Sequence, residues 1–249
     1  ETLLIGRALL AGELGMLATA PLASLAAFVV AALIHFGGAW TLLGLSQQRI
    51  GVARTGALVA AAPLVGTLLA AAFLDEPLTW ATAGGVSLAA AGVALISMSG
   101  RSDDGDWARP WFALGVALLW GTSPLLIRLG LRGFDQPLLG LTAGLAVSVL
   151  VYGVVLSMSG AWRRPLPGAA LGWISLGGAV STLAISAQWL SFGLTTIAIS
   201  ITIQQLSTLV VVALVPLLFH EPFERFNPRF LIGTAAMLGG AAIVVAAGA

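Results

Sequence analysis

The sequence contains no cysteine and no lysine, and it has few charged residues of any kind. Without cysteine, the chain cannot form a disulfide, a thiolate metal site or a cysteine nucleophile. All eleven cationic residues are arginines scattered along the chain, and the formal net charge is only +1. A nucleic-acid partner generally requires a dense basic tract, so the sequence predicts no such partner.

The scarcity of charge also excludes an ordinary soluble domain. Charged residues make up 8% of the chain and hydrophobic residues 59%, whereas about a quarter of a soluble domain is charged. Apolar runs of about twenty residues are long enough to cross the hydrocarbon of a bilayer as helices. They are too long and too uniformly apolar for the strands of a membrane barrel. The sequence therefore predicts an all-α, multi-pass membrane bundle surrounded by lipid.

Polar residues, proline and glycine divide the chain into nine apolar segments, and we predict that each is a spanning helix. The segments are 2–20, 22–46, 51–74, 79–98, 110–131, 137–158, 168–193, 196–219 and 228–248.

An internal repeat is visible on either side of the most hydrophilic stretch, which lies near the middle of the chain. Glu76-Pro77 before the last helix of the first half matches Glu221-Pro222 before the last helix of the second. Each of these last helices carries two glycines seven residues apart, which lie on one helical face and permit close packing. These glycines are Gly85 and Gly92 in the first half and Gly233 and Gly240 in the second. We predict a first repeat over 1–99, a linker over 100–109 and a second repeat over 110–249.

The two predicted repeats differ by one helix. Before its last helix the second half has four segments and the first half has three, so we expect that the first repeat lacks one span in this sequence. The expected unit is therefore five helices plus five. An odd number of helices per repeat places the two repeats in inverted orientation in the membrane.

The order of these motifs resembles the EamA branch of the drug/metabolite transporter superfamily. The resemblance rests on Arg7 in ETLLIGRALLAG, on Pro63 before LLAAAFLDEPLTW, on GVSLAAAGVALI, and on LLWGTSPLLIRLGL at the start of the second half. It implies a ten-helix secondary transporter in the bacterial inner membrane, with a central cavity and no cofactor. Members of this branch export amino acids and other metabolites.

The orientation of the chain in the membrane stays open between two alternatives. The positive-inside rule places the arginine-rich face in the cytoplasm and the C-terminus outside, whereas the resemblance implies a C-terminus inside. The predicted arginine-rich face carries Arg49, Arg54, Arg101, Arg109, Arg163, Arg164, Arg225 and Arg229, and the opposite face carries Arg128 and Arg132.

Polar residues in the middle of a span are costly, so they usually face a cavity or a neighbouring helix. On the second segment, His35 lies on a stripe of small residues with Trp40 close by. Substrate or proton binding by His35 and a simple interhelical hydrogen bond explain this pattern equally well. On the fifth segment, Trp120 and Ser123 come just before Pro124. Proline in the middle of a helix causes a kink, and kinked helices often line a binding site.

Two further segments carry amides. Gln188 and Trp189 end a small-polar stripe on the seventh segment, and Gln204 and Gln205 adjoin within the eighth. Buried amides need partners, which substrate or another helix can supply. We predict that these residues bind substrate, with hydrogen bonding between helices as the alternative. Glu13 on the first segment is, with His35, a candidate proton carrier.

Other conspicuous residues have structural explanations. Asp75, Glu76 and Glu221 fall at helix ends and are expected to shape hairpins before serving function. On the sixth segment, one helical face is expected to pack against other helices. Its residues are Gly140, Gly144, Ser148 and Tyr152. Tryptophans near predicted span ends are expected to anchor the chain at the membrane interface. They are Trp80, Trp107, Trp111, Trp162 and Trp173.

These patterns favour secondary transport of a small molecule. The chain has no phosphate-binding loop of an ATPase, no zinc-protease or nucleophile-elbow motif, and only two histidines, far apart in sequence. We therefore predict no enzymatic activity and no metal. A non-transporting membrane scaffold is the alternative, and substrate identity, transport direction, coupling ion and oligomeric state are not predicted.

Overall fold

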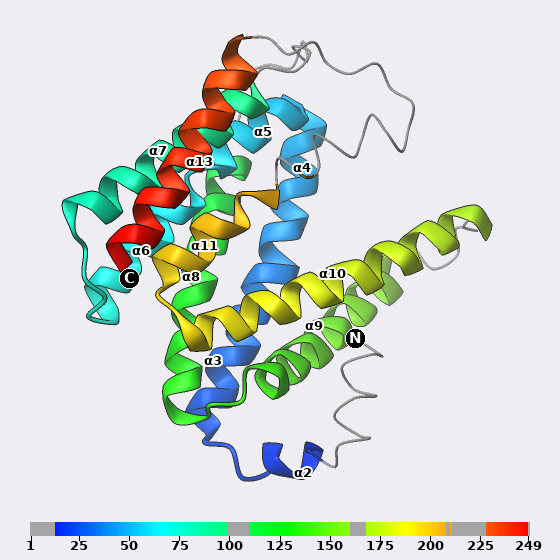
Figure 1. The fold of residues 1–249 in the computed structure, drawn as a ribbon. Coiled ribbons are helices and arrows are strands. Elements are labelled where there is room, and N and C mark those ends of the chain that lie inside the picture. The colour runs from blue at the N-terminus through cyan, green and yellow to red at the C-terminus, as the bar shows by residue number, and fades with distance from the viewer. Residues whose placement is uncertain (1–12, 99–109, 160–167, 208–209, 211–227, 249) are drawn as a thin grey trace. The chain divides into compact units, whose positions relative to one another are not determined.

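The computed structural model describes residues 13–98, 110–159, 168–207, 210 and 228–248 (Figure 1), and in these ranges the regular structure is helical without strands. The predicted all-α class is therefore confirmed. The helices are α2 (Leu14–Leu17), α3 (Leu22–Ala32), the π-helix η1 (Leu33–Ala39), α4 (Trp40–Ile50), α5 (Val52–Val59), α6 (Ala62–Phe73), α7 (Trp80–Ser97), α8 (Trp111–Gly133), α9 (Pro137–Ser159), α10 (Gly168–Leu194), α11 (Ile197–Gln204) and α13 (Pro228–Gly248).

Six helical stretches in the described part of the chain are long and apolar enough to span a membrane. They are Leu22–Ile50, Arg54–Phe73, Trp80–Ser97, Trp111–Gly133, Pro137–Met158 and Pro228–Gly248. Nine spans were expected. Most of the first predicted span lies outside the described residues, and the eighth contributes only α11 and the turn after it.

Two of the predicted helices are interrupted in the structure, one by a π-helix and one by a turn. The second segment passes through η1, where the glycine pair Gly37-Gly38 loosens the usual helical hydrogen-bond pattern. The third segment consists of α5 and α6, which are separated by a turn at Ala60 and Ala61 just before Pro63. Proline has no backbone N–H, so it fits the first turn of α6 and not the middle of one long helix.

The described chain forms two compact units, and each takes segments from both sides of the predicted linker. Unit 1 comprises Glu1–Gly37 and Leu126–Leu194, and unit 2 comprises Gly38–Leu125 and Thr195–Ala249. The division into two sequence repeats stays a prediction. The linker itself and the second Glu-Pro pair, Glu221-Pro222, lie outside the described residues.

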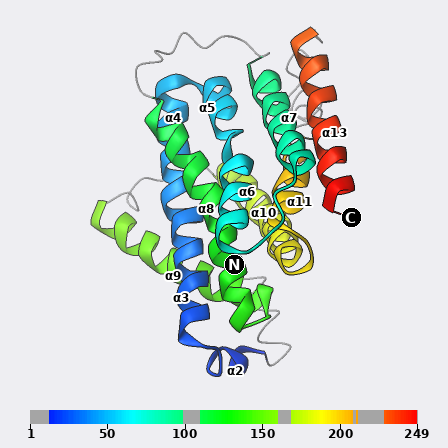
Figure 2. The same cartoon turned by 90° about the vertical axis from the view of Figure 1, so that its left-hand side faces the viewer.

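Unit 2 is organised around α7 and α13, which lie side by side along their lengths (Figures 1 and 2). A methyl group added at Gly92 would lie 2.5 Å from the Gly233 carbonyl oxygen, and one added at Gly240 would lie 2.5 Å from that of Gly85. The pairing of Gly85 with Gly240 and of Gly92 with Gly233 makes the two helices antiparallel. The glycine faces predicted from the sequence therefore meet each other, backbone against backbone.

Unit 1 is organised around α3, which packs against α9. Phe28 of α3 is fully buried and lies against three glycines, Gly130 of α8 and Gly140 and Gly144 of α9. Its ring also packs against Trp189 of α10, with ring centroids 5.8 Å apart. The small residues of α9 thus form a recess for one large aromatic ring, in keeping with the predicted packing role of this stripe.

Candidate functional site

In unit 1, His35 lies in η1 and is half-buried, with its ring 4.8 Å from that of Phe36. A π-helix shifts the hydrogen-bond pattern and often occurs at functional positions. Here the hydroxyl of Tyr152 on α9 donates to the carbonyl oxygens of Phe36 and Gly37, both at 3.1 Å. The only tyrosine of the chain therefore stabilises the irregular turn that holds His35, a contact that the sequence analysis missed.

Gln188 and Trp189 lie near the C-terminal end of α10, also in unit 1. Trp189 is 2% exposed and packs on Phe28, which gives it a place in the core. Gln188 is half-buried, and its backbone carbonyl accepts a 2.7 Å hydrogen bond from the Ser191 hydroxyl. One turn on, the Arg128 guanidinium donates to the carbonyl oxygen of Phe192. This end of α10 is thus tied to α3 and α8 through contacts that the apolar sequence pattern did not reveal.

Unit 2 brings three of the predicted site residues together. Trp40, at the start of α4, meets Trp120 of α8 edge to face, with ring centroids 6.2 Å apart. Ser123 is 1% exposed, and its hydroxyl donates to the Trp120 carbonyl oxygen at 3.3 Å. That carbonyl is the one that Pro124 leaves without its helical donor, because proline has no N–H to offer four residues on. Ser123 therefore compensates for the proline, and its role in substrate binding stays a prediction.

The proline-containing segment of α8 lies directly against α6. A methyl group at Gly121 would lie 2.6 Å from the Cβ of Val65, and one at Gly66 would lie 3.2 Å from the Gly121 carbonyl oxygen. Such close approach leaves no space for a larger side chain at either position. The segment of α8 that carries Trp120 and Ser123 thus contacts α6 through Gly121.

Further polar groups are buried in α6 and α11. The hydroxyls of Thr67, Ser200 and Thr202 are 6%, 7% and 1% exposed as residues, and none has a hydrogen-bond partner in the described structure. Buried hydroxyls are normally paired, so each of these three has the capacity to bind water or a polar ligand. Their only sequence signal is a hydroxyl on an otherwise apolar helix, which is common in membrane proteins.

Glu76 joins the hairpin after α6 to the start of α11. Its two carboxylate oxygens lie 3.1 and 2.9 Å from the backbone N–H of Ile197, 121 residues away in sequence. Thr196 caps the same helix, because its hydroxyl accepts from the N–H of Ile199 at 3.4 Å. Helix N-termini have unpaired N–H groups and favour negative charge, so Glu76 stabilises α11. Glu76 therefore lies in the hairpin, as the sequence predicted, and also binds the N-terminus of α11.

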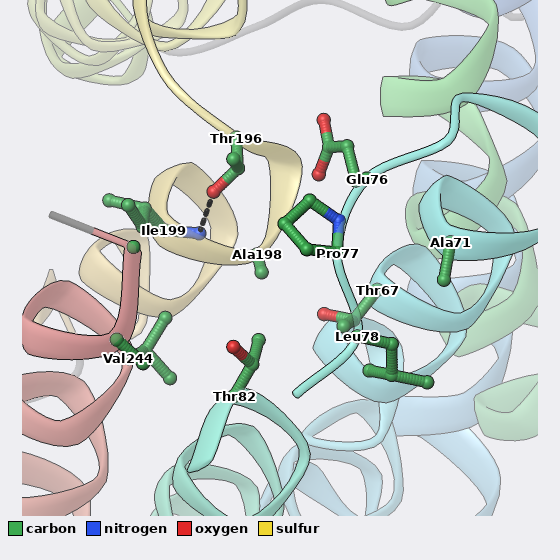
Figure 3. A pocket seen from close by; sticks show the side chains of 12 residues that line it. Thr67, Ala71, Glu76, Pro77, Leu78, Thr82, Thr196, Ala198, Ile199 and Val244 are labelled. Carbon is green, nitrogen blue, oxygen red and sulfur yellow. Dashed lines mark hydrogen bonds between the residues drawn. The ribbon is translucent and has the colours of Figure 1, made fainter. Parts of the chain in front are cut away.

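A cavity with about 350 Å³ of unfilled space, part of it open to solvent, lies beside this contact (Figure 3). Glu76, Thr67, Thr82 and Thr196 line it, together with apolar residues of α11 and α13 such as Ala198 and Val244. All of these residues belong to unit 2.

The remaining predicted site residues lie at helix ends. Gln204 is the last residue of α11 and is exposed, and Gln205 is the half-buried residue that follows. The sequence predicted both amides within a span over 196–219, where α11 ends at Gln204 and most of the later residues lie outside the described part of the chain. Glu13 is half-buried just before α2 in unit 1. The described residues contain no group of acidic or histidine side chains arranged to hold a metal.

The predicted substrate residues consequently divide between the two units. His35, Gln188 and Trp189 belong to unit 1, and the others belong to unit 2. Among the latter, the structure joins Trp40, Trp120 and Ser123.

Comparison with known proteins shows what this chain is similar to. Residues 3–98 match the family model described as the EamA-like transporter family. This first part of the chain is therefore similar to EamA-like transporters. The resemblance seen in the sequence is confirmed, and the chain is a multi-pass membrane protein, which in bacteria places it in the inner membrane.

The chain is also similar to a curated relative and to a solved structure. The relative, from Streptantibioticus cattleyicolor, is named "Probable terminal-alkyne amino-acid exporter" and is 29% identical over 162 residues. The match covers 59% of this chain and 53% of the relative, so it spans about half the relative's length. A solved crystal structure of a protein matches with a TM-score of 0.62 at 15% identity and covers 91% of this chain and 87% of its own. That likeness supports the fold alone.

Proposed function

We propose that this protein is a secondary transporter that exports small polar or amphipathic metabolites, such as amino acids, by alternating access. The observation that carries the proposal is the match of residues 3–98 to a transporter family. The name of the curated relative supports export and an amino-acid substrate. A transporter of this kind binds its substrate and is not expected to transform it chemically.

The interior of unit 2 supports a polar or amphipathic substrate. Trp40 and Trp120 offer aromatic faces, and the Trp40 side chain is half exposed, so the pair is accessible from one side. The unpaired hydroxyls of α6 and α11 lie in the same unit. A solute with an apolar body and a few hydrogen-bonding groups matches such a lining.

Alternating access fits two inverted repeats, with 1–99 and 110–249 rocking around a site near the middle of the membrane. The antiparallel packing of α7 and α13 supports this arrangement, because they are the last helices of the two predicted repeats. In this proposal protons drive export, with Glu13 and His35 as the predicted carriers.

Proteoliposomes loaded with a pool of unlabelled amino acids and amines provide the test. Uptake of each labelled solute by counterflow is measured with and without an imposed pH gradient, for the wild type and for Trp120→Ala, His35→Ala and Gln204→Ala. Leu118→Ala is the matched control, since Leu118 lies on α8 close to Trp120 but is 55% exposed. Saturable flux that falls at least about tenfold in Trp120→Ala and persists in Leu118→Ala is expected, by analogy with the loss of a buried aromatic anchor.

Each result has a distinct meaning. Flux that responds to the pH gradient and loses this response in His35→Ala supports proton coupling. Equal flux in Trp120→Ala and Leu118→Ala contradicts the role of the tryptophan pair. Absence of flux for every solute, from protein that unfolds cooperatively, favours a membrane scaffold over a transporter.

A further inference from the structure

The π-helix η1 changes the hydrogen-bond register within its span. In a π-helix each N–H bonds to the carbonyl five residues back, and in an α-helix to the carbonyl four residues back. Where a π-helix passes into an α-helix, this change passes over one carbonyl. Because η1 ends at Ala39 and α4 begins at Trp40, the carbonyl that is passed over belongs to residue 36 or 37. Inside a membrane such a carbonyl needs a donor from another part of the protein.

Tyr152 of α9 supplies this donor. Its hydroxyl oxygen lies 3.1 Å from the carbonyl oxygens of both Phe36 and Gly37, which are the two candidates for the carbonyl that is passed over. A hydroxyl has a single hydrogen, so it serves both carbonyls only by sharing that hydrogen between them. The bond therefore lies at the point where η1 passes into α4.

The helix α9 holds this hydroxyl at a fixed place along the span. Gly140 lies against the ring of Phe28, and a Cβ added at Gly144 would lie 2.9 Å from the Phe28 carbonyl oxygen. Tyr152 follows these two glycines at helical spacing and contacts the chain further on, at Phe36. The two helices thus run in the same direction with close contacts before the hydroxyl is reached. The donor is carried by a well-packed helix face.

There is room around η1 for its backbone to move. A Cβ added at Gly37 would meet nothing within 4 Å. His35 is half-buried, and its ring lies 4.8 Å from the ring of Phe36. The contacts therefore run from the Tyr152 hydroxyl to the backbone of Phe36, and from the ring of Phe36 to that of His35. A change of the backbone at Phe36 changes the direction of His35.

We propose that Tyr152 is a positioning residue, whose hydroxyl fixes the register of η1 and, through it, the direction of the His35 side chain. When this donor is absent, the register change moves along the helix to a place where the carbonyl finds another donor. Each residue of such a movement turns the residues between by up to about 100° around the helix axis. The importance of this positioning for transport rests on the proposed function, in which His35 binds protons or substrate.

Cysteine labelling measures the direction of η1 without any transport. The sequence has no cysteine, so a single introduced cysteine reacts with N-ethylmaleimide at one known place. The probes are Leu33→Cys, Ile34→Cys, His35→Cys and Phe36→Cys, each in lipid nanodiscs. Every rate is measured with Tyr152 intact, with Tyr152→Phe, which removes only the hydroxyl, and with Ser148→Ala. Ser148→Ala is the matched control, because Ser148 is a buried hydroxyl of α9 that donates to Gly144 of its own helix.

The order of the four labelling rates should shift by one residue in Tyr152→Phe and stay as in the wild type in Ser148→Ala. An unchanged order in Tyr152→Phe overturns the positioning role, even if that variant unfolds more easily. In a second arm, the proteoliposome flux that His35→Ala removes should fall at least about tenfold in Tyr152→Phe, by analogy with the loss of a group that orients a ligand.

The two arms separate failure of this proposal from failure of the proposed function. A shifted order of rates with unchanged flux upholds the positioning and contradicts the role of His35 in transport. If the wild type transports nothing, the proposed function fails, and the labelling alone decides on Tyr152.

A second replacement covers the case in which Tyr152→Phe does not fold. Para-fluorophenylalanine at position 152 fills the space of the hydroxyl and has no hydrogen to donate, so it should give the same shift in the labelling rates. If neither variant folds, the hydroxyl serves folding, and the positioning role is overturned.

Discussion

The two units of this protein use glycine in opposite ways. In unit 2, Gly85 and Gly92 of α7 meet Gly240 and Gly233 of α13, so that backbone atoms of two helices touch with nothing between them. In unit 1, Gly130, Gly140 and Gly144 instead surround the ring of Phe28. One arrangement brings two helix backbones into direct contact at the glycines, and the other places a single large side chain between the glycines.

The difference determines how each unit should respond to added volume. A backbone carbonyl held in a helix cannot move without moving the helix, whereas the end of a side chain can turn away. A glycine on the packed face of a membrane helix therefore has no single structural role. Its cost of substitution depends on whether the neighbour is a backbone or a ring.

The largest effect is expected for Gly92→Val. Its Cβ would lie 2.5 Å from both the Gly233 carbonyl oxygen and the Met237 amide nitrogen, so α7 and α13 must separate. We expect a loss of about 3 kcal/mol or more in the free energy of unfolding, at the upper end for overpacking. Thermal or denaturant unfolding in detergent measures it. Gly84→Val is the matched control on the same helix, because a Cβ at Gly84 meets nothing within 4 Å. Equal losses in the two variants would show that α7 and α13 do not pack through their glycines.

A somewhat smaller effect is expected for Phe28→Ala in unit 1. Phe28 is fully buried between glycines that cannot fill the space it leaves, so a cavity should remain. Removal of such a ring costs about 3 kcal/mol in well-packed cores. The same unfolding measurement applies, with Phe73→Ala as control, since Phe73 is 62% exposed and its loss should cost less than about 1 kcal/mol. A Phe28→Ala variant as stable as Phe73→Ala would contradict the central place of Phe28.

Gly140→Ala should cost less again, about 1 kcal/mol, because its Cβ would approach the Phe28 ring at 2.8 Å and the ring can shift. Gly153→Ala, on the same helix with open space around it, is the control. The comparison is sharpened by Phe28→Leu, whose smaller side chain should reduce the cost of Gly140→Ala. Additive effects of Gly140→Ala and Phe28→Leu would argue that the two residues do not touch.

The sequence was sufficient to predict the helical membrane class, the EamA resemblance and the glycine faces of the last helices. These features depend on composition and on the helical period, and both can be determined from short stretches of the sequence. It could not show that Gly85 and Gly92 face Gly240 and Gly233, because the partner of a small residue is a matter of tertiary packing. Nor did it place η1, where the signal was only the pair Gly37-Gly38.

The candidate site was less predictable than the fold. Glu76 was expected to shape a hairpin, and its contact with Ile197 spans 121 residues, a distance over which no local pattern carries information. Thr67 looked like an ordinary hydroxyl in a membrane helix until its lack of a partner was visible. Gln204 and Gln205 looked buried because the apolar run continues past them, but α11 ends at Gln204. Sequence reasoning thus located polar residues but not their surroundings.

The smallest effect concerns the pair formed by Trp40 and Trp120 in unit 2. Edge-to-face rings contribute about 0.5–1.5 kcal/mol beyond the area they bury. A double-mutant cycle with Trp40→Leu and Trp120→Leu, measured by unfolding in detergent, should therefore give a coupling energy within that range. The second cycle, with Trp80→Leu in place of Trp40→Leu, is the control, because Trp80 is 94% exposed at the start of α7 and should show no coupling to Trp120.

If the two cycles agree, the contact between the rings adds nothing to stability. If only the first shows coupling, and Trp120→Leu also abolishes flux, the pair serves packing and substrate binding at once, in contrast to Phe28, whose ring only packs.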